Sequence, residues 1–206
     1  SIRKHHDIFD GVVKKLSETS DIEFMIHRPF EELLNIRETI QKLKSADFLI
    51  LKASTKISMD ILALAKQYNI PVLHDMDAVL RCKSRVYLDS CLRQIYEEHE
   101  EELEDFLMPI PESWVGFVKK ENLQEFKEWA KPRLPIILKS HDQHDKWIRF
   151  SFLARTADEI DDFYELYKEF SNYSVYTQEY IKCDEIDRKI YVVGDFSQFE
   201  CRDKFL

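Results

Sequence analysis

Short apolar runs alternate with helix-like patterns in the first third of the chain. The run ADFLILK (Ala46–Lys52) ends at a polar loop, which is typical of a buried parallel strand. Ile57–Asn69 has apolar residues at helical spacing, and Ile70–Leu73 predicts another short strand. Earlier, Asp21–His27 predicts one more strand and Pro29–Leu43 one more helix. This order predicts a βαβ crossover, and therefore an open α/β domain with a parallel sheet.

A longer helical pattern starts at Asp75 and runs into the acidic stretch EEHEEELEDF, which is typical of a solvated helix face or connector. MPIPES (Met108–Ser113) then ends the helix, because two nearby prolines favour extended backbone. We therefore predict two domains: residues 1–107, an α/β domain with its connecting helix, and residues 108–206.

The second half has a different pattern, with strands joined by short links. A capping box, Thr156 with Glu159, opens the second of its helices. Adjacent strands with short links favour an antiparallel α+β unit. The predicted strands are Trp114–Val118, Leu134–Lys139, Trp147–Leu153, Val175–Ile181 and Lys189–Val193, and the predicted helices are Asn122–Ala130 and Ala157–Phe170.

The charge balance limits the possible partners. Thirty basic and 39 acidic side chains give a net charge of -9, so the surface as a whole would repel nucleic acid and anionic membranes. An anionic ligand therefore needs a local basic pocket. No apolar run is long enough to span a bilayer and no signal-peptide core is present, so we expect a cytoplasmic monomer.

Cysteine and histidine spacing offers little support for a metal centre. The cysteines form no CxxC pair and have no histidine at zinc-ligand spacing, which favours reduced, buried thiols. His141 and His144 have i,i+3 spacing, which fits either metal ligands or a polar surface loop. The four cysteines are Cys82, Cys91, Cys183 and Cys201.

Basic residues recur at the ends of the predicted strands, namely Lys52, Lys139, Lys189 and Arg202. The chain has no Walker P-loop, GxGxxG or GxSxG motif. Open α/β sheets bind ligands at strand ends, although a lone lysine there is most often solvated. Lys139 directly follows PIIL, which should be buried, so its ammonium group needs a partner such as phosphate oxygens.

Several stretches in this order resemble the ATP-grasp fold, and within it the inositol 1,3,4-trisphosphate 5/6-kinase family. ADFLILK resembles the family's strand that ends in a substrate-facing lysine, and LPIILK resembles its strand with the ATP-phosphate lysine. HDMDAVLRCKSRVYL and PESWVGF resemble the segments between them. TQEYIKCDEIDRKIYVVGD resembles the family's hinge and following strand, with the same distance from Gln178 to Lys189. The resemblance covers Lys52 to Arg202, and only the last stretch is specific by itself.

This resemblance implies a combined α/β and α+β ATP-grasp fold with ATP and Mg²⁺ as cofactors. Arg85 and Lys139 would contact the ATP phosphates. The residues that it places near ATP are Arg85, Lys139, Gln178, Glu179, Tyr180, Ile181 and Lys189, of which the stretch from Gln178 to Ile181 would bind the adenine edge through its backbone.

The resemblance also implies a kinase that transfers the γ-phosphate to an inositol polyphosphate, a small-molecule substrate. Lys52, His144 and Lys189 would meet the substrate phosphates, and Arg202 would lie near the transferred phosphate. The implied catalytic set is therefore His144, Lys189 and Arg202, with the histidine as a donor to the transferring group. Phosphoryl transfer needs mainly such positioning and charge neutralisation.

The sequence departs from the family in three places. Ser140 replaces a proline after the lysine, and the glycine-bearing phosphate loop before the histidine is missing. The C-terminal Asp…Asp-x-Asn set that holds Mg²⁺ is also missing, so we assign no metal ligand and expect the second domain to be incomplete. Three functions stay open: an inositol phosphate kinase, an ATP-grasp carboxylate–amine ligase that forms an acyl phosphate, and a non-catalytic nucleotide-binding module.

Overall fold

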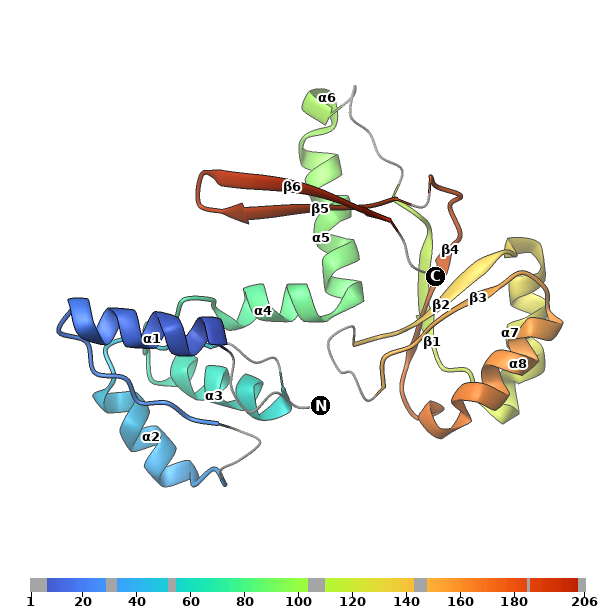
Figure 1. The fold of residues 1–206 in the computed structure, drawn as a ribbon. Coiled ribbons are helices and arrows are strands. Elements are labelled where there is room, and N and C mark those ends of the chain that lie inside the picture. The colour runs from blue at the N-terminus through green and yellow to red at the C-terminus, as the bar shows by residue number, and fades with distance from the viewer. Residues whose placement is uncertain are drawn as a thin grey trace. The chain divides into compact units, whose positions relative to one another are not determined.

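A computed structural model describes residues 7–28, 33–51, 55–103, 110–142, 148–184 and 186–203. Figure 1 shows its elements along the chain. The chain divides into two compact units, Ser1–Val79 and Leu80–Leu206. The division lies well before the boundary that the sequence predicts near residue 107, because the long connecting helix is hydrogen-bonded to the sheet of the second unit.

The first unit contains one βαβ crossover. Leu49 and Val72 form a parallel bridge on either side of a helix, as the sequence predicts, and backbone bonds of 2.8 Å from Leu49 N to Pro71 O and 3.0 Å from Leu73 N to Leu49 O support it. Within the described residues the sheet is limited to this bridge. The helices of this unit are α1 (Asp7–Thr19), α2 (Ile36–Ser45) and α3 (Lys56–Gln67).

Local capping chemistry explains the bounds of α3. At its start, the Thr55 hydroxyl oxygen accepts a hydrogen bond of 3.2 Å from Ser58 N. At its end, Asn69 has a φ of 55°, and Ile70 N donates to Ala65 O over 2.9 Å in a Schellman motif. Asparagine is one of the few residues other than glycine that adopts this conformation readily. The predicted helix is confirmed to within two residues.

The predicted strand Asp21–His27 is wrong, because this stretch has no regular secondary structure. Its apolar residues stay exposed, including Ile22 at 47% and Met25 at 53%. An extended segment becomes a strand only when a neighbour accepts its backbone hydrogen bonds. The predicted helix from Pro29 begins only at Ile36, where Asn35 caps the Glu38 amide at 3.1 Å; residues 29–32 lie outside the described part of the chain.

Three helices follow, and side-chain caps again set two of their starts. Asp75 Oδ1 accepts from Ala78 N at 2.6 Å, and the Ser84 hydroxyl accepts from Tyr87 N at 3.4 Å. Across the described ranges, every helix is too short or too polar to cross a bilayer. The three helices are α4 (Met76–Lys83), α5 (Arg85–Glu98) and α6 (Glu100–Leu103).

The second unit contains an antiparallel sheet of order β1-β4-β2-β3, with α7 and α8 against one face. This confirms the predicted antiparallel α+β unit. The predicted strand from Trp147 begins only at Ser151, while residues 143–147 are not described. The elements are β1 (Ser113–Gly116), α7 (Leu123–Ala130), β2 (Ile136–Ser140), β3 (Ser151–Ala154), α8 (Asp158–Tyr167) and β4 (Val175–Glu179), with 3₁₀ turns η2 (Lys120–Asn122), η3 (Lys131–Arg133) and η4 (Lys168–Phe170).

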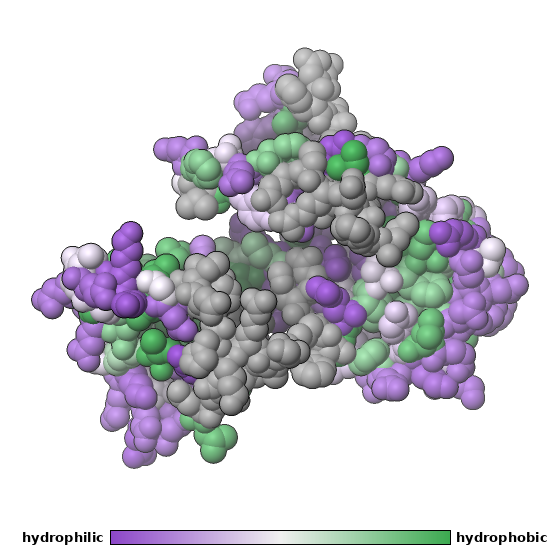
Figure 2. Space-filling view, in the orientation of Figure 1, coloured by the Kyte–Doolittle hydropathy of each residue, from purple (hydrophilic) through white to green (hydrophobic). Residues whose placement is uncertain are grey.

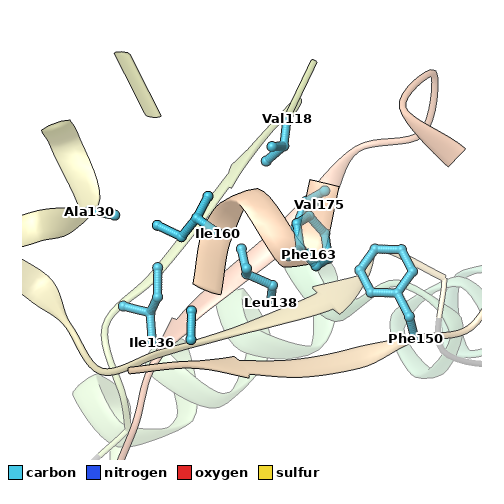
Figure 3. Packing of buried hydrophobic residues seen from close by; sticks show 9 residues of the cluster. Val118, Ala130, Ile136, Leu138, Phe150, Ile160, Phe163 and Val175 are labelled. Atoms are coloured by element: carbon cyan, nitrogen blue, oxygen red, sulfur yellow. The ribbon is translucent and has the colours of Figure 1, made fainter. Parts of the chain in front are cut away.

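The core of this unit lies between the sheet and α8. Ile136 and Leu138 on β2 and Ile160 on α8 are each 0% exposed. Figure 3 shows that these side chains and Phe163 point toward one another. Figure 2 shows hydrophilic residues on the outer side of the helices at the right of the view. Burial of alternate residues of β2 leaves Ile137 and Lys139 on the opposite face.

The capping box before α8 is confirmed in part. The Thr156 hydroxyl oxygen accepts from Glu159 N at 3.3 Å, as predicted. The Glu159 carboxylate, however, accepts from Arg155 N at 2.6 Å, one residue before the cap. Both bonds satisfy backbone donors at the start of the helix.

The strands β5 (Ile186–Val193) and β6 (Phe196–Asp203) form a separate antiparallel hairpin. Gly194 has a φ of 58°, which suits its place in the two-residue turn. Large apolar side chains stay exposed on the hairpin, including Ile190 at 68% and Phe199 at 56%.

Asp184, just before the hairpin, forms an ion pair with Arg188 on β5. This ion pair lowers the pKa of Asp184 to about 2. The first cause is the hydrogen bond from Arg188, helped by Ile186 N. We predict a carboxyl titration midpoint near 2 by carbon NMR, and a return toward the ordinary 3.8 in Arg188→Ala. A depressed carboxyl pKa favours folding above its unfolded value, and this contribution is lost as the pH falls from about 4 to about 2. An unchanged midpoint in the variant would contradict the assignment.

The cysteines at the described positions are thiols outside any disulfide, but the prediction that they are buried is wrong. Cys82 and Cys183 are exposed, and Cys91 is half-buried. Cys82 lies in the last turn of α4 and Cys183 in the link after β4, so neither position faces a core.

Candidate functional site

The sheet face opposite the core carries polar side chains and a lysine. We call it the Lys139 face. Cross-strand register places these residues on one side, because alternate residues of a strand point to opposite faces. Its members are Ser113, Val115, Ile137, Lys139, Ser151, Leu153, Tyr176 and Gln178.

Lys139 is half-buried at the end of β2, and its Nζ donates to Gln178 Oε1 on β4 over 2.7 Å. The amide oxygen holds the ammonium group over the sheet without neutralising its charge. The sequence predicts both residues as ATP contacts, and the structure brings them together. A half-buried positive charge of this kind is well placed to meet an anion.

Arg85 is the first residue of α5, and its Nε donates to the Ser140 carbonyl oxygen over 2.9 Å. Arg85 therefore reaches the same end of β2 as Lys139. Burial lowers the pKa of the Arg85 guanidinium, and the charge of Arg149 lowers it further, against raising contributions from Tyr176 and Asp142 that are each smaller than the effect of burial. A second guanidinium near Arg85 makes this strand end more cationic still.

The segment around Arg85 is joined to the end of β2 by several contacts, which we call the strand-end clasp. Ser84 and Asp142 form an antiparallel bridge, and Lys83 Nζ lies 2.8 Å from an Asp142 oxygen. The Ser84 hydroxyl lies 3.4 Å from His141 Nε2. The clasp consists of Lys83, Ser84, Arg85, Ser140, His141 and Asp142.

His141 has one polar atom that the described residues leave unpartnered. Its Nδ1 is buried and has no hydrogen-bond partner there. The neighbouring Ser140 N donates to Phe150 O at 3.1 Å, so β2 and β3 stay paired beyond Lys139 and the alternation places His141 and Arg149 on the Lys139 face. Neither His141 nor Arg149 was predicted from the sequence to lie on the face that carries Lys139. The alternation of a strand, in which every second residue points the same way, could have indicated His141.

The predicted hinge begins where β4 ends. Glu179 N donates to Glu112 O at 2.9 Å and Tyr180 N to Pro135 O at 3.3 Å, so both amides are used within the protein. The side chains of Tyr180 and Ile181 are 37% and 38% exposed. Adenine recognition by this stretch stays a prediction, and it would use the carbonyl groups or the Ile181 amide.

The other predicted residues lie in the hairpin or outside the described residues. Lys189 is half-buried on β5 opposite Glu200, and Arg202 lies on β6 opposite Asp187. This register puts Lys189 and Arg202 on one face of the hairpin. The backbone alone is described at Arg202, and Lys52 and His144 are not described. Their predicted roles stay predictions.

Metal ligands are not gathered anywhere in the part of the chain that the structure describes. No three His, Cys, Asp or Glu residues there lie close enough to hold an ion. The cations gathered at this end of the Lys139 face, Lys139 and Arg85, favour an anion as ligand.

No protein-family model matches the sequence, and a search of curated proteins found no match. Solved structures do match. A RimK domain ATP-grasp protein from Sphaerobacter thermophilus DSM 20745 has a TM-score of 0.56 at 15% identity, over 92% of this chain and 66% of that one. N5-carboxyaminoimidazole synthase from Aspergillus clavatus, in complex with ADP and 5-aminoimidazole ribonucleotide, has a TM-score of 0.53 at 14% identity, over 89% and 42%.

A third match is N5-carboxyaminoimidazole ribonucleotide synthetase from Thermus thermophilus, with a TM-score of 0.51 at 12% identity, over 82% of this chain and 39% of that one. The chain therefore spans between 39% and 66% of the length of these three structures. Identities this low carry information on the fold alone. The topology of the sheet and these likenesses together show that the chain has an ATP-grasp fold, as the sequence predicts.

Proposed function

We propose that the Lys139 face binds the phosphates of ATP and that the chain is part of an ATP-dependent enzyme. The observation that carries the proposal is the Lys139–Gln178 hydrogen bond of 2.7 Å, with Arg85 anchored at the same strand end. Two cations held by different elements can contact different phosphate oxygens of one nucleotide.

The electrostatics of the chain favour a local anion site. A protein of net charge -9 repels anions over most of its surface, so cations concentrated at one strand end would draw them to that place. Arg85, Lys139 and Arg149 are such a set. The buried Nδ1 of His141 has no hydrogen-bond partner among the described residues and is a polar atom that a ligand would satisfy. The residues therefore fit a polyphosphate.

Mg²⁺ is the second cofactor that the resemblance implies. The described residues include no ligand set for it, so we assign it no position and no step. The work that this chain's own residues can do is to bind the phosphates, orient them and neutralise the charge that develops during transfer.

For the reaction class, we favour a carboxylate–amine ligase, in which the γ-phosphate activates a carboxylate and an amine then displaces the phosphate. Two of the three structures described above are named as a synthetase or synthase. One of them holds ADP beside 5-aminoimidazole ribonucleotide, whose name specifies an amine. This supports a ligase over transfer to a hydroxyl group.

Inositol polyphosphate phosphorylation is the second candidate. It rests on the stretch from Gln178 to Lys189 and on the register that puts Lys189 and Arg202 on one face of the hairpin. A polyanionic substrate would need these additional cations, whereas a ligase would not.

The test is an ADP-release assay with ATP and Mg²⁺ on the full chain, against inositol phosphates in one arm and carboxylic acids with amines in the other. We expect release only when acid and amine are both present. Release with an inositol phosphate alone would favour the kinase. Titration of ADP by calorimetry tests nucleotide binding separately, and an absence of heat at millimolar ADP would overturn the proposed site.

A further inference from the structure

Three charged residues follow one another along a single face of α5. Arg85, Asp89 and Arg93 are spaced four residues apart, which places their side chains on the same side of the helix. Arg85 Nε donates to Ser140 O on β2 over 2.9 Å, and Arg93 Nη2 donates to Pro111 O just before β1 over 2.8 Å. This face of α5 is therefore turned toward the sheet of the second unit.

Asp89 is at the centre of this contact. Its Oδ1 accepts from the Ser113 hydroxyl on β1 at 2.9 Å and from the Tyr176 hydroxyl on β4 at 3.2 Å. Its Oδ2 accepts from Arg93 Nε at 2.8 Å, and its side chain is only 18% exposed. One carboxylate thus joins the helix to two strands.

The environment of Asp89 keeps it ionised. Burial by itself raises the pKa of the carboxyl, but the hydrogen bonds from Arg93, Ser113 and Tyr176 outweigh burial and lower the pKa on balance. A charged acceptor makes stronger hydrogen bonds than a neutral one. The ionised Asp89 carboxylate therefore accepts strong hydrogen bonds from Arg93, Ser113 and Tyr176.

A contact of this kind fixes both the rotation and the axial position of α5. Asp89 lies about 6 Å along the helix from Arg85, and a shift of one residue would turn either side chain by about 100° around the axis. Ser113 and Tyr176 are on the Lys139 face, so the carboxylate ties Arg85 to the same face that carries Lys139. Without it, nothing else among these contacts holds α5 to β4.

We propose that Asp89 is a positioning residue, which holds the Arg85 guanidinium beside Lys139 for contact with nucleotide phosphate. The inference rests on the proposed nucleotide site and adds a residue to it that touches no ligand. In this role Asp89 acts through Arg85.

The test compares Asp89→Asn with wild-type protein by two readouts. The amide keeps the shape of the side chain but replaces one acceptor oxygen with a donor and removes the charge. The first readout is hydrogen exchange at Arg85 Nε–H by nitrogen NMR, assigned with Arg85→Lys. We expect slow exchange in the wild type, where this group donates to Ser140 O, and fast exchange in Asp89→Asn.

The second readout is binding of ADP and of adenosine. Asp89→Asn should weaken ADP binding roughly tenfold and leave adenosine binding unchanged. It should have no further effect on ADP binding in the Arg85→Ala background, because the same contact is already lost. The matched control is Asp161→Asn, which removes the partner of Lys127 between α7 and α8, on the other side of the sheet.

Each outcome decides a separate point. Unchanged exchange at Arg85 Nε–H in Asp89→Asn overturns the positioning role, whether or not stability falls. Equal losses for ADP and adenosine, or additive losses with Arg85→Ala, also overturn it. If wild-type protein binds no ADP, the nucleotide site fails, while the exchange data still decide whether Asp89 places Arg85. If Asp89→Asn does not fold, Tyr176→Phe and Ser113→Ala each remove one bond to Asp89 and serve in its place.

Discussion

Replacing Lys139 by alanine should weaken ADP and ATP binding by about 2–3 kcal/mol, which is roughly 30- to 150-fold. The side chain is half-buried and held by Gln178, so its ammonium group has a defined place on the sheet from which to contact a phosphate. The free energy of unfolding should change by about 1 kcal/mol or less, because the hydrogen bond to Gln178 joins two partly exposed side chains. Calorimetric titration and urea denaturation of the same samples measure both quantities.

Lys168→Ala is the matched control for this prediction. Lys168 is an exposed lysine on η4 that pairs with Glu165, away from the Lys139 face. Its loss should leave nucleotide affinity unchanged, because exposed ion pairs contribute little. Equal affinities for wild type and Lys139→Ala would remove Lys139 from the site, and equal losses in both variants would indicate a general effect of net charge.

The neighbouring substitution, Leu138→Ala, should have the opposite effect: a large loss of stability and little direct effect on nucleotide affinity. Leu138 is 0% exposed and packs in the cluster with Ile136, Ile160 and Phe163 (Figure 3). Truncation removes apolar contact and leaves a cavity, so we expect the free energy of unfolding to fall by about 3 kcal/mol or more. Urea denaturation followed by tryptophan fluorescence measures the loss.

Val115→Ala provides the comparison for Leu138→Ala. Val115 lies on β1 with 52% exposure, on the Lys139 face, so little contact is lost there. Its effect should stay below about 1 kcal/mol. A loss at Leu138 no larger than the loss at Val115 would show that β2 is not the centre of this core.

Elements with strong local signals were predicted well. For α3 the apolar spacing predicts the helix to within two residues at each end, because helical hydrogen bonds are made within the segment itself. The strand at Asp21–His27 failed for the converse reason. Its apolar pattern resembles that of a strand, but no neighbouring segment among the described residues pairs with it.

Site residues divide in a similar way. The sequence pattern points to Lys139, because a lysine after four apolar residues is unusual on physical grounds. It does not point to Asp89, whose importance depends on the meeting of α5, β1 and β4. The positions of Ser113 and Tyr176 in the sequence do not reveal that α5 packs against β1 and β4.

The sequence by itself determined the positions of most second-unit strands, the Thr156 cap before α8, the acidic charge and the occurrence of basic residues at strand ends. Those properties depend on neighbours within a few residues of each other, so periodicity and local chemistry reveal them. The tertiary structure alone decided that Lys139 faces Gln178, that Arg85 reaches Ser140 and that Asp89 joins α5 to the sheet. These contacts depend on strand register and on the rotation of α5, which are set by packing between segments that lie far apart in the chain.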